Sequence, residues 1–221
     1  MKNLLILVCL LISESSFAQK PYRHSPLYQR GLYLSFNPHS IFEPQQGAVG
    51  IGAGYRINKR WEVWNELNYL YKGFLQDPNE FKNLQGIRNI TSLKYFYNNK
   101  HGFFVGTEFR YKHYSFDDKN TFINSQLNDT LRNIPYKSSH TLLGGGVFWG
   151  KRFKVTANGK FELEGNVGLG VKQRYIKRKQ VPAGYEKINY YVKDRIFLLP
   201  DFDEEQSLPY FPAIVRFIYH L

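Results

Sequence analysis

Uncharged side chains recur at every second position along several segments of this chain, and this alternation limits its possible folds more than any other feature. A period of two is typical of β-strands, whose successive side chains point to opposite faces of a sheet, and a helical period does not recur. Six segments have one face without any charge. These faces comprise Val49, Ile51, Ala53, Tyr55 and Ile57; Trp61, Val63, Asn65, Leu67, Tyr69 and Tyr71; Ile87, Asn89, Thr91, Leu93, Tyr95 and Tyr97; Phe103, Val105, Thr107, Phe109 and Tyr111; Phe161, Leu163, Gly165, Val167, Leu169 and Val171; and Ala213, Val215, Phe217, Tyr219 and Leu221.

The alternating segments predict an all-β fold of eight antiparallel strands. We place the strands at about 31–37, 47–57, 61–72, 87–97, 102–114, 141–152, 160–175 and 209–221. The connections after the second, fourth and sixth strands are short, whereas the others, at about 38–46, 73–86, 115–140 and 176–208, are long. Outer-membrane barrels alternate in this way, with short periplasmic turns and long external loops. We therefore expect an eight-stranded antiparallel up-and-down transmembrane β-barrel.

Two observations indicate that the uncharged face points outward to lipid and does not form a soluble core. Aromatic residues crowd both ends of the strands, as they do at the two interfaces of a bilayer. The expected aromatic girdle consists of Tyr55, Trp61, Tyr97, Phe103, Trp149, Phe161 and Tyr219 at one end and Tyr69, Tyr71, Tyr111 and Tyr175 at the other. The opposite face mixes glutamates with arginines and lysines beside glycines, and an eight-stranded interior has room for side chains but not for a channel.

Charges inside such a barrel must be paired, because an unpaired buried charge is costly. The expected interior ion-pair network consists of Arg56, Glu66, Lys94, Glu108, Arg110, Glu164 and Arg216. Its glutamates are also candidate acid–base carboxylates. We expect ion pairing rather than catalysis, since a filled interior admits no substrate. An open apolar cavity would instead favour a secreted, lipocalin-like carrier of a small ligand.

The start of the chain has the pattern of a secretory signal peptide. A basic start at Lys2 precedes the apolar run Leu4–Ile12, and Ser16-Phe17-Ala18 is a suitable cleavage site. The single cysteine, Cys9, lies in this run, so the mature chain would have no disulfide and no thiolate site. We expect a signal peptide at 1–18, an N-terminal periplasmic segment at 19–30 and a barrel domain at 31–221, located in the outer membrane of a diderm bacterium.

Several local motifs resemble those of the small OmpA/OmpX-type outer-membrane β-barrel proteins. The motifs are Asn37-Pro38, Gly54-Tyr55-Arg56-Ile57-Asn58-Lys59-Arg60-Trp61, Ser92-Leu93-Lys94-Tyr95-Phe96-Tyr97, Gly106-Thr107-Glu108-Phe109-Arg110-Tyr111-Lys112, and Glu164 followed by Gly168-Leu169-Gly170-Val171. The segment from Val215 to Leu221 resembles the terminal strand that outer-membrane assembly machinery recognises, with Leu221 where phenylalanine is usual. The resemblance implies a fold, a location and contact with that machinery, but no particular activity.

Basic residues give the chain a net charge of +12, from 30 Lys and Arg against 18 Asp and Glu. Five of them gather where the seventh strand would leave the membrane: Lys172, Arg174, Lys177, Arg178 and Lys179. Basic patches can bind nucleic acid, but the phosphates of lipopolysaccharide are the nearer anions for an exported barrel. We expect these residues to bind lipid A phosphates through charge-assisted hydrogen bonds, and we expect no nucleic-acid partner.

One pair of residues is a candidate for catalysis. His113 and Ser115 share a strand face at the external end and resemble the H-x-S pair of lipid A 3-O-deacylases. A serine nucleophile needs a base and an orienting acid, and no acid stands at a suitable position on the neighbouring strand. We therefore expect a polar pair at the rim. No histidine spacing indicates a metal site, and we expect no cofactor.

The sequence thus predicts a structural or interaction protein of the outer membrane, a monomer with lipid and lipopolysaccharide around it and loops available for partners. The first alternative is a lipid-acting hydrolase that uses His113 and Ser115. The second alternative is the secreted lipocalin-like carrier.

Overall fold

The computed structural model describes residues 31–38, 46–73, 82–98, 102–156, 159–187 and 205–221, which form β-strands and no α-helix. The strands are β1 (Gly31–Phe36), β2 (Gln46–Arg56), β3 (Trp61–Lys72), β4 (Lys82–Asn98), β5 (Phe103–Asn124), β6 (Asp129–Lys154), β7 (Phe161–Lys179), β8 (Glu186–Lys187), β9 (Glu205–Tyr210) and β10 (Ala213–His220). Within these ranges, no helix has the length and apolar character needed to cross a membrane. The segments predicted at 1–18 and 19–30 lie outside the described residues.

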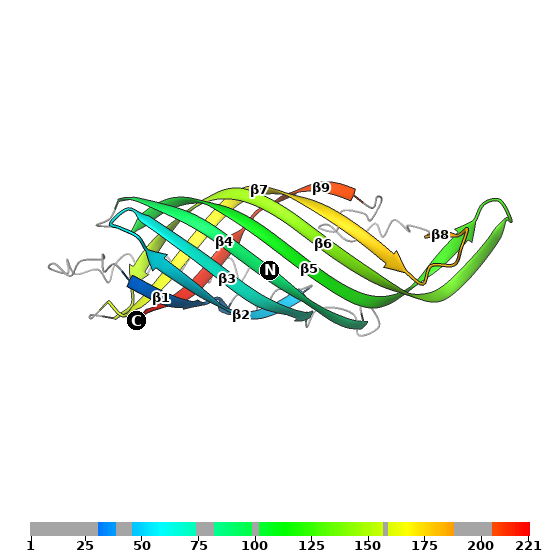
Figure 1. Ribbon diagram of the computed structural model, residues 1–221, viewed down its shortest axis with the longest axis horizontal. Coiled ribbons are helices and arrows are strands. Elements are labelled where there is room, and N and C mark those ends of the chain that lie inside the picture. The colour runs from blue at the N-terminus through cyan, green and yellow to red at the C-terminus, as the bar shows by residue number, and fades with distance from the viewer. Residues whose placement is uncertain (1–30, 39–45, 74–81, 99–101, 157–158, 188–204) are drawn as a thin grey trace, which may run out of the picture.

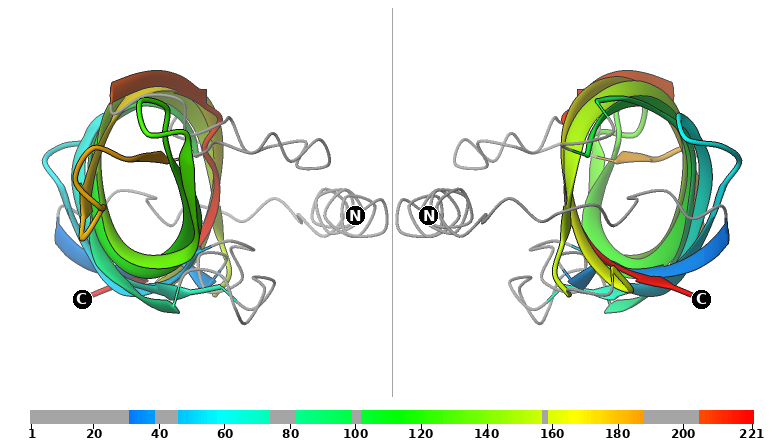
Figure 2. Two further views of the ribbon diagram at one scale, coloured as in Figure 1. Left: turned by 90° about the vertical axis from the view of Figure 1, so that its right-hand side faces the viewer. Right: turned by 90° about the vertical axis from the view of Figure 1, so that its left-hand side faces the viewer.

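The strands form one antiparallel sheet that closes on itself (Figure 1). Each strand from β1 to β6 pairs with the next, and β10 completes the ring by pairing with both β7 and β1. β9 and β10 run along β7 one after the other, so nine strands occupy eight positions around the ring. Seen along its axis, the sheet is a closed oval (Figure 2). The predicted all-β class and antiparallel order of neighbouring strands are confirmed.

The prediction of a long loop at 115–140 is wrong. β5 continues to Asn124 and β6 begins at Asp129, so the two strands form a hairpin that extends beyond the ring (Figure 1). The side-chain oxygen of Asn124 accepts hydrogen bonds from the backbone amides of Gln126 and Leu127, which closes the turn. We call residues 118–136 the arm, its side of the ring the arm end, and the opposite side, with the short turns, the turn end.

The last position in the ring differs from the single strand predicted at 209–221. Phe211 and Pro212 interrupt it, with β9 before them and β10 after them. Proline has no amide hydrogen to donate to a neighbouring strand, which favours an interruption here. The carbonyl of Pro212 still accepts a hydrogen bond of 2.9 Å from the amide of Gly168, so the chain stays attached to β7.

Large side chains fill the narrow interior, and glycines on facing strands make room for them. A methyl group on Gly54 would overlap the ring of Tyr33, and one on Gly106 would overlap the ring of Phe148. Tyr33 packs with Trp64 and Ile218 in one buried cluster, while Phe148 packs with aromatic residues in another. Gly54 and Gly106 therefore serve packing inside the ring.

Candidate functional site: an uncharged exterior around a charged interior

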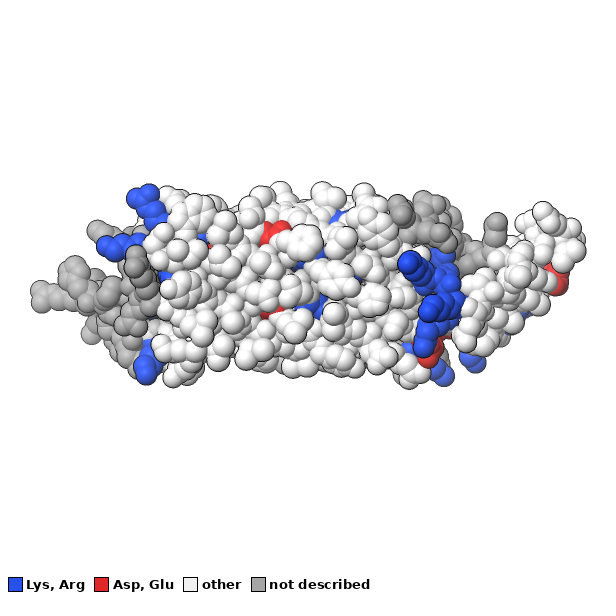
Figure 3. All heavy atoms as spheres, viewed as in Figure 1, with Lys and Arg blue, Asp and Glu red and all other residues white. Residues whose placement is uncertain are grey.

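The exterior of the ring is apolar where the interior is charged. Strand β3 alternates strictly, with Leu67 exposing 54% of its surface and the adjacent Glu66 exposing 2%. On β10, Phe217 exposes 49% and Arg216 exposes 1%. Among the described residues, the outward positions between the two ends carry no charge. Figure 3 shows the large blue clusters toward the two ends, with only small blue and red areas visible between white side chains midway. This is the orientation that the sequence predicted, with charged side chains inside.

The few polar side chains on this exterior hydrogen-bond to one another. Asn65 donates to Asn89 at 3.2 Å and to Thr91 at 2.8 Å, and Asn89 donates back to Asn65 at 3.1 Å. Ser207 likewise donates to Gln173 across two neighbouring strands. Polar groups that pair in this way need no water, which lowers their cost in an apolar environment.

Most residues of the predicted aromatic girdle lie on the outside near the ends of the strands. The most exposed are Tyr55, Trp61, Tyr69, Tyr97, Trp149 and Phe161, while Tyr71, Phe103, Tyr111, Tyr175 and Tyr219 are partly covered. At the turn end, the rings of Phe161 and Tyr219 lie 4.8 Å apart, and those of Tyr97 and Phe103 stack at 6.2 Å. These contacts join neighbouring strands into an aromatic border.

Two buried glutamates organise the interior at the turn end. Glu164 accepts hydrogen bonds from Lys94 at 2.8 and 2.9 Å and from Arg216 at 2.5 Å. Arg152 donates to both carboxylates, at 2.7 and 2.8 Å to Glu62 and at 2.5 Å to Glu164. Lys94 also lies 3.1 Å from Glu62, so Lys94 and Arg152 are each held between two acids. Arg216 contacts Glu164 alone among the described acids.

The structure brings together only part of the predicted network. Lys94, Glu164 and Arg216 meet directly, and Arg56 reaches the network through Glu62 at 3.7 Å. The other predicted members lie closer to the arm end. There Arg110 binds Glu108 through two nitrogens, and Glu66 accepts a hydrogen bond of 2.8 Å from Asn68.

Two central members of the network, Glu62 and Arg152, are missing from the predicted set. Glu62 stands on the charged side of the β3 alternation, and Arg152 stands two residues from the end of β6. Alternation assigns both residues to the interior. It does not show that they meet, because their strands lie on different sides of the ring, separated in sequence by 90 residues.

The five basic residues predicted to bind lipid A phosphates lie on two faces of β7. Lys177 and Lys179 are exposed, whereas Lys172 and Arg174 alternate with them and share the inward face of buried Ile176. Arg178 pairs with Ser138, whose side chain is buried in the interior. The predicted continuous outer patch therefore reduces to two lysines on this strand.

These two lysines belong to an outer cluster that spans four strands. In cross-strand register, Lys82 of β4, Asp117 of β5, Lys137 of β6 and Lys179 of β7 form one row, and Lys177 stands beside it. Lys137 is 3.8 Å from Asp117, and both side chains are exposed to solvent. We call Lys82, Lys137, Lys177 and Lys179 the basic collar. The basic collar lies at the arm end, next to the apolar part of the exterior (Figure 3).

The residues of the candidate catalytic pair do not bond to each other in the structure. Nδ1 of His113 lies 2.9 Å from the hydroxyl of Thr141 on β6, and Ser115 is the cross-strand partner of Ser139. The described part of the chain shows no hydrogen bond between His113 and Ser115. It also contains no group of three or more His, Cys, Asp or Glu residues arranged to hold a metal ion.

Comparisons with known protein families, curated proteins and solved structures found no match for this chain.

Proposed function

We propose that this protein is an outer-membrane β-barrel with a structural or interaction role, similar to the small OmpA/OmpX-type proteins. The observation that carries the proposal is the uncharged exterior of a closed sheet whose ions lie inside. In a bilayer, every backbone amide and carbonyl must bond within the protein, and a closed sheet meets this requirement through its strand pairs. An apolar exterior of this extent on a protein in water would favour aggregation.

Aromatic borders on the exterior also support the proposal. Aromatic residues border the apolar band at the turn end and lie again near Tyr69 and Tyr111 toward the arm end. Such borders fit the two polar interfaces of a bilayer. In this proposal, the arm end faces outward from the cell, and the turn end faces the periplasm.

The basic collar fits the layer of lipid phosphates that begins where the apolar band ends. Four lysines against Asp117 give this level of the exterior a positive charge. In this proposal, the collar binds phosphates of lipopolysaccharide, with Lys137, Lys177 and Lys179 in place of the inward-facing Lys172 and Arg174.

The arm provides a surface for partners outside the membrane. It ends in an exposed turn, where Leu127 exposes 68% of its surface. Its strand β6 continues beyond the last residue of β7 in the register, Lys179, so no strand among the described residues pairs with the edge from Asp129 to Pro135 on that side. Free strand edges and exposed turns are common sites of protein recognition.

The location is tested by expressing the full chain in a diderm host and separating the membranes. We expect the protein in the outer-membrane fraction, with a faster-migrating band on electrophoresis in SDS before boiling than after it. A chain found in the soluble periplasmic or secreted fraction, without detergent and with native β-structure, would contradict the proposal and favour the lipocalin-like alternative. The charged interior argues against that alternative, which expects an apolar cavity.

The collar is tested by replacing Lys137, Lys177 and Lys179 with glutamine. We expect the thermal midpoint of the variant to fall in bilayers that contain lipopolysaccharide and to stay unchanged in phosphatidylcholine bilayers. A control variant removes the same number of charges at the turn end, at Lys59, Arg60 and Lys160. If both variants behave alike in lipopolysaccharide, the collar has no special role there.

A further inference from the structure

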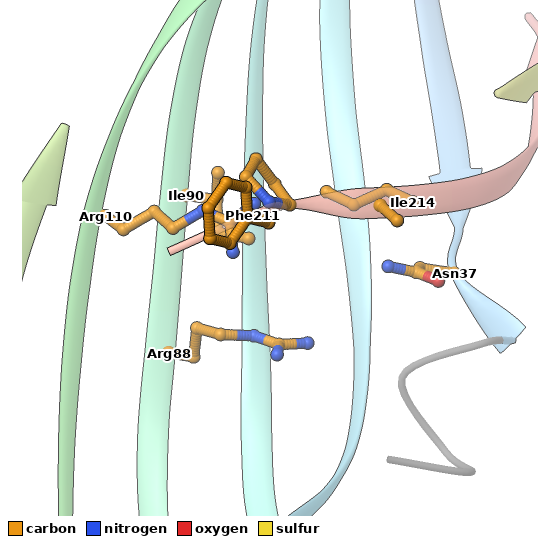
Figure 4. Close-up of a pocket in the computed structure, with 8 residues that line it drawn as sticks. Asn37, Arg88, Ile90, Arg110, Phe211 and Ile214 are labelled. Carbon is orange, nitrogen blue, oxygen red and sulfur yellow. The ribbon is translucent and has the colours of Figure 1, made fainter. Parts of the chain in front are cut away.

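A pocket of about 250 Å³ lies inside the ring, on the arm side of the ion network. Its lining comes from Asn37 after β1, Arg88 and Ile90 of β4, Arg110 of β5, and the run Phe211–Ile214 at the junction of β9 and β10. Figure 4 shows the guanidinium of Arg88 and the amide of Asn37 extending into it from opposite sides. The interior is therefore filled at the turn end but holds a cavity farther along.

One nitrogen of Arg110 is available to a molecule in this pocket. The Nε and Nη2 atoms of Arg110 donate to the two carboxylate oxygens of Glu108, at 2.6 and 3.2 Å. Tyr210 also donates to Glu108, at 3.0 Å, and its ring lies 5.0 Å from the Arg110 guanidinium. Nη1 of Arg110 has no hydrogen-bond partner among the described residues. The guanidinium is thus held in place with one edge unused.

Positive charge is concentrated in this part of the interior. Two neighbouring rows of inward-facing cross-strand partners run across β3 to β7 and include Arg88, Ile90 and Arg110 of the pocket lining. The rows are Glu66, Ile90, Arg110, Gly144 and Lys172, and Asn68, Arg88, Lys112, Leu142 and Arg174. They contain five cations and one carboxylate, and the carboxylate of Glu108 stands in the next row. An anion of more than one charge would lower the repulsion among these cations.

The rest of the lining is apolar. Ile90, Pro212 and Ile214 are buried, and Phe211 and Ala213 complete the lining. Phe211 exposes 74% of its surface, so the pocket opens at the junction of β9 and β10. Among the described residues, β1 pairs with β10 only from Phe217 to His220, and the segment Ala213–Arg216 pairs only with β7. A hydrocarbon could therefore leave the pocket sideways, along Phe211.

We propose that this pocket binds a phosphate monoester carried on a hydrocarbon chain. The phosphate lies between Arg88 and the free edge of Arg110, with the Asn37 amide as a further donor, and the hydrocarbon lies against Ile214 and Phe211. Guanidinium groups match the oxygens of phosphate geometrically, and a dianion offsets more of the surplus charge than a carboxylate does. The pocket lies within the ring, so this binding does not require that the exterior sits in a bilayer.

The proposal is tested with the full chain purified in an uncharged detergent. Hexyl phosphate, inorganic phosphate and hexanol are titrated separately, and binding is measured by calorimetry and by the shift of the thermal midpoint. We expect hexyl phosphate to bind at least ten times more tightly than inorganic phosphate, and hexanol to show no saturable binding. Equal affinity for both phosphates would assign the pocket to free phosphate and overturn the hydrocarbon part. Saturable binding of hexanol alone would overturn the anion part.

Two variants place the binding in this pocket. Arg88→Gln removes a cation, and Asn37→Asp adds a negative charge with almost no change of shape. We expect each to weaken hexyl phosphate binding by at least ten-fold. The control Lys59→Gln removes an exposed cation at the turn end, outside both the pocket and the basic collar, and should leave the affinity unchanged. Because Asn37→Asp is nearly isosteric, it keeps the test valid if Arg88→Gln fails to fold. Unchanged affinity in folded Asn37→Asp, or an equal loss in Lys59→Gln, would overturn the assignment.

Discussion

Glu164 is the residue on which the interior of the turn end depends most. Its carboxylate receives hydrogen bonds from Lys94, Arg152 and Arg216, and its side chain is fully buried. Three cations that meet at one carboxylate repel one another once its charge is removed. Because buried charges have lost their water, breaking a buried ion pair lowers stability far more than breaking an exposed pair does.

We expect Glu164→Gln to destabilise the protein by about 3–5 kcal/mol, because the substitution keeps the shape but leaves three buried cations with one acid fewer. The free energy of unfolding is measured by urea titration in phospholipid vesicles, followed by tryptophan fluorescence. The control is Asp117→Asn, which removes the partner of Lys137 at 3.8 Å on the exterior and should change stability by about 1 kcal/mol or less. Similar losses in both variants would show that the buried network adds little.

At the scale of the strands, the close approach of backbone and aromatic rings sets the shape of the ring. Gly54 of β2 faces the ring of Tyr33 on β1, and a methyl group there would overlap it. Gly165 of β7 differs, because a methyl group built on it meets no atom within 4 Å. The two glycines therefore have different roles, although both lie within strands.

We expect Gly54→Ala to lower stability by about 1–3 kcal/mol, as overpacking does in filled interiors. Gly165→Ala should be neutral or stabilising by up to about 1 kcal/mol, since alanine restricts the unfolded chain and fits the open space. Urea midpoints of the two variants and of the unchanged protein give the comparison. An equal loss of stability in both variants would mean that the glycines are needed for their backbone conformation and not for the contact with Tyr33.

Sequence patterns predicted the strands of the ring and failed at the arm, for a physical reason. In the ring, one face is the uncharged exterior and the other is the interior, so residues such as Val49 and Ile51 alternate clearly with small or charged ones. In the arm, both faces of the hairpin meet solvent apart from a small contact of Phe122 with Tyr136, whose rings lie 5.7 Å apart. Burial, with the adjacent Asp118, raises the pKa of Tyr136, which donates a 2.9 Å hydrogen bond to that carboxylate. Such isolated contacts leave no periodic pattern.

The arm should fold and unfold separately from the ring. Its described contacts are internal or with the segment that ends in β8, which pairs at Phe122 and Ile123, while Tyr185 just before it donates a hydrogen bond to Asp129. We expect that replacing residues 120–134 by a two-residue Asn-Gly turn leaves the urea midpoint of the ring unchanged within error, and removes any partner binding that uses the arm. A large fall in the midpoint would show that the arm supports the ring.

At the scale of the whole molecule, the face of each residue was predictable and the distances across the ring were not. Alternation separates Lys177 and Lys179 from Lys172 and Arg174, and applying it along the whole of β7 divides the predicted basic patch correctly. The meeting of Glu62 with Arg152 depends on the tilt and stagger of strands around the ring, which local sequence does not encode. The pocket beside Arg88 and Arg110 depends on the same stagger and on the interruption at Phe211 and Pro212.

The direction in which the apolar side chains point leads to the most decisive prediction. Leu67 stands in the middle of β3 and exposes 54% of its surface, while Leu127 in the arm turn exposes 68%. If the band lies in lipid, Leu67→Arg should destabilise the protein by about 2–4 kcal/mol in phospholipid vesicles, because a charge there loses its water. Leu127→Arg should change stability by less than about 0.5 kcal/mol, since that side chain stays in water. The two variants are compared by urea titration in the same vesicles. Both leucines are exposed, so an exterior band in water would tolerate arginine equally at the two positions. Equal effects would therefore mean that the band meets water and not lipid.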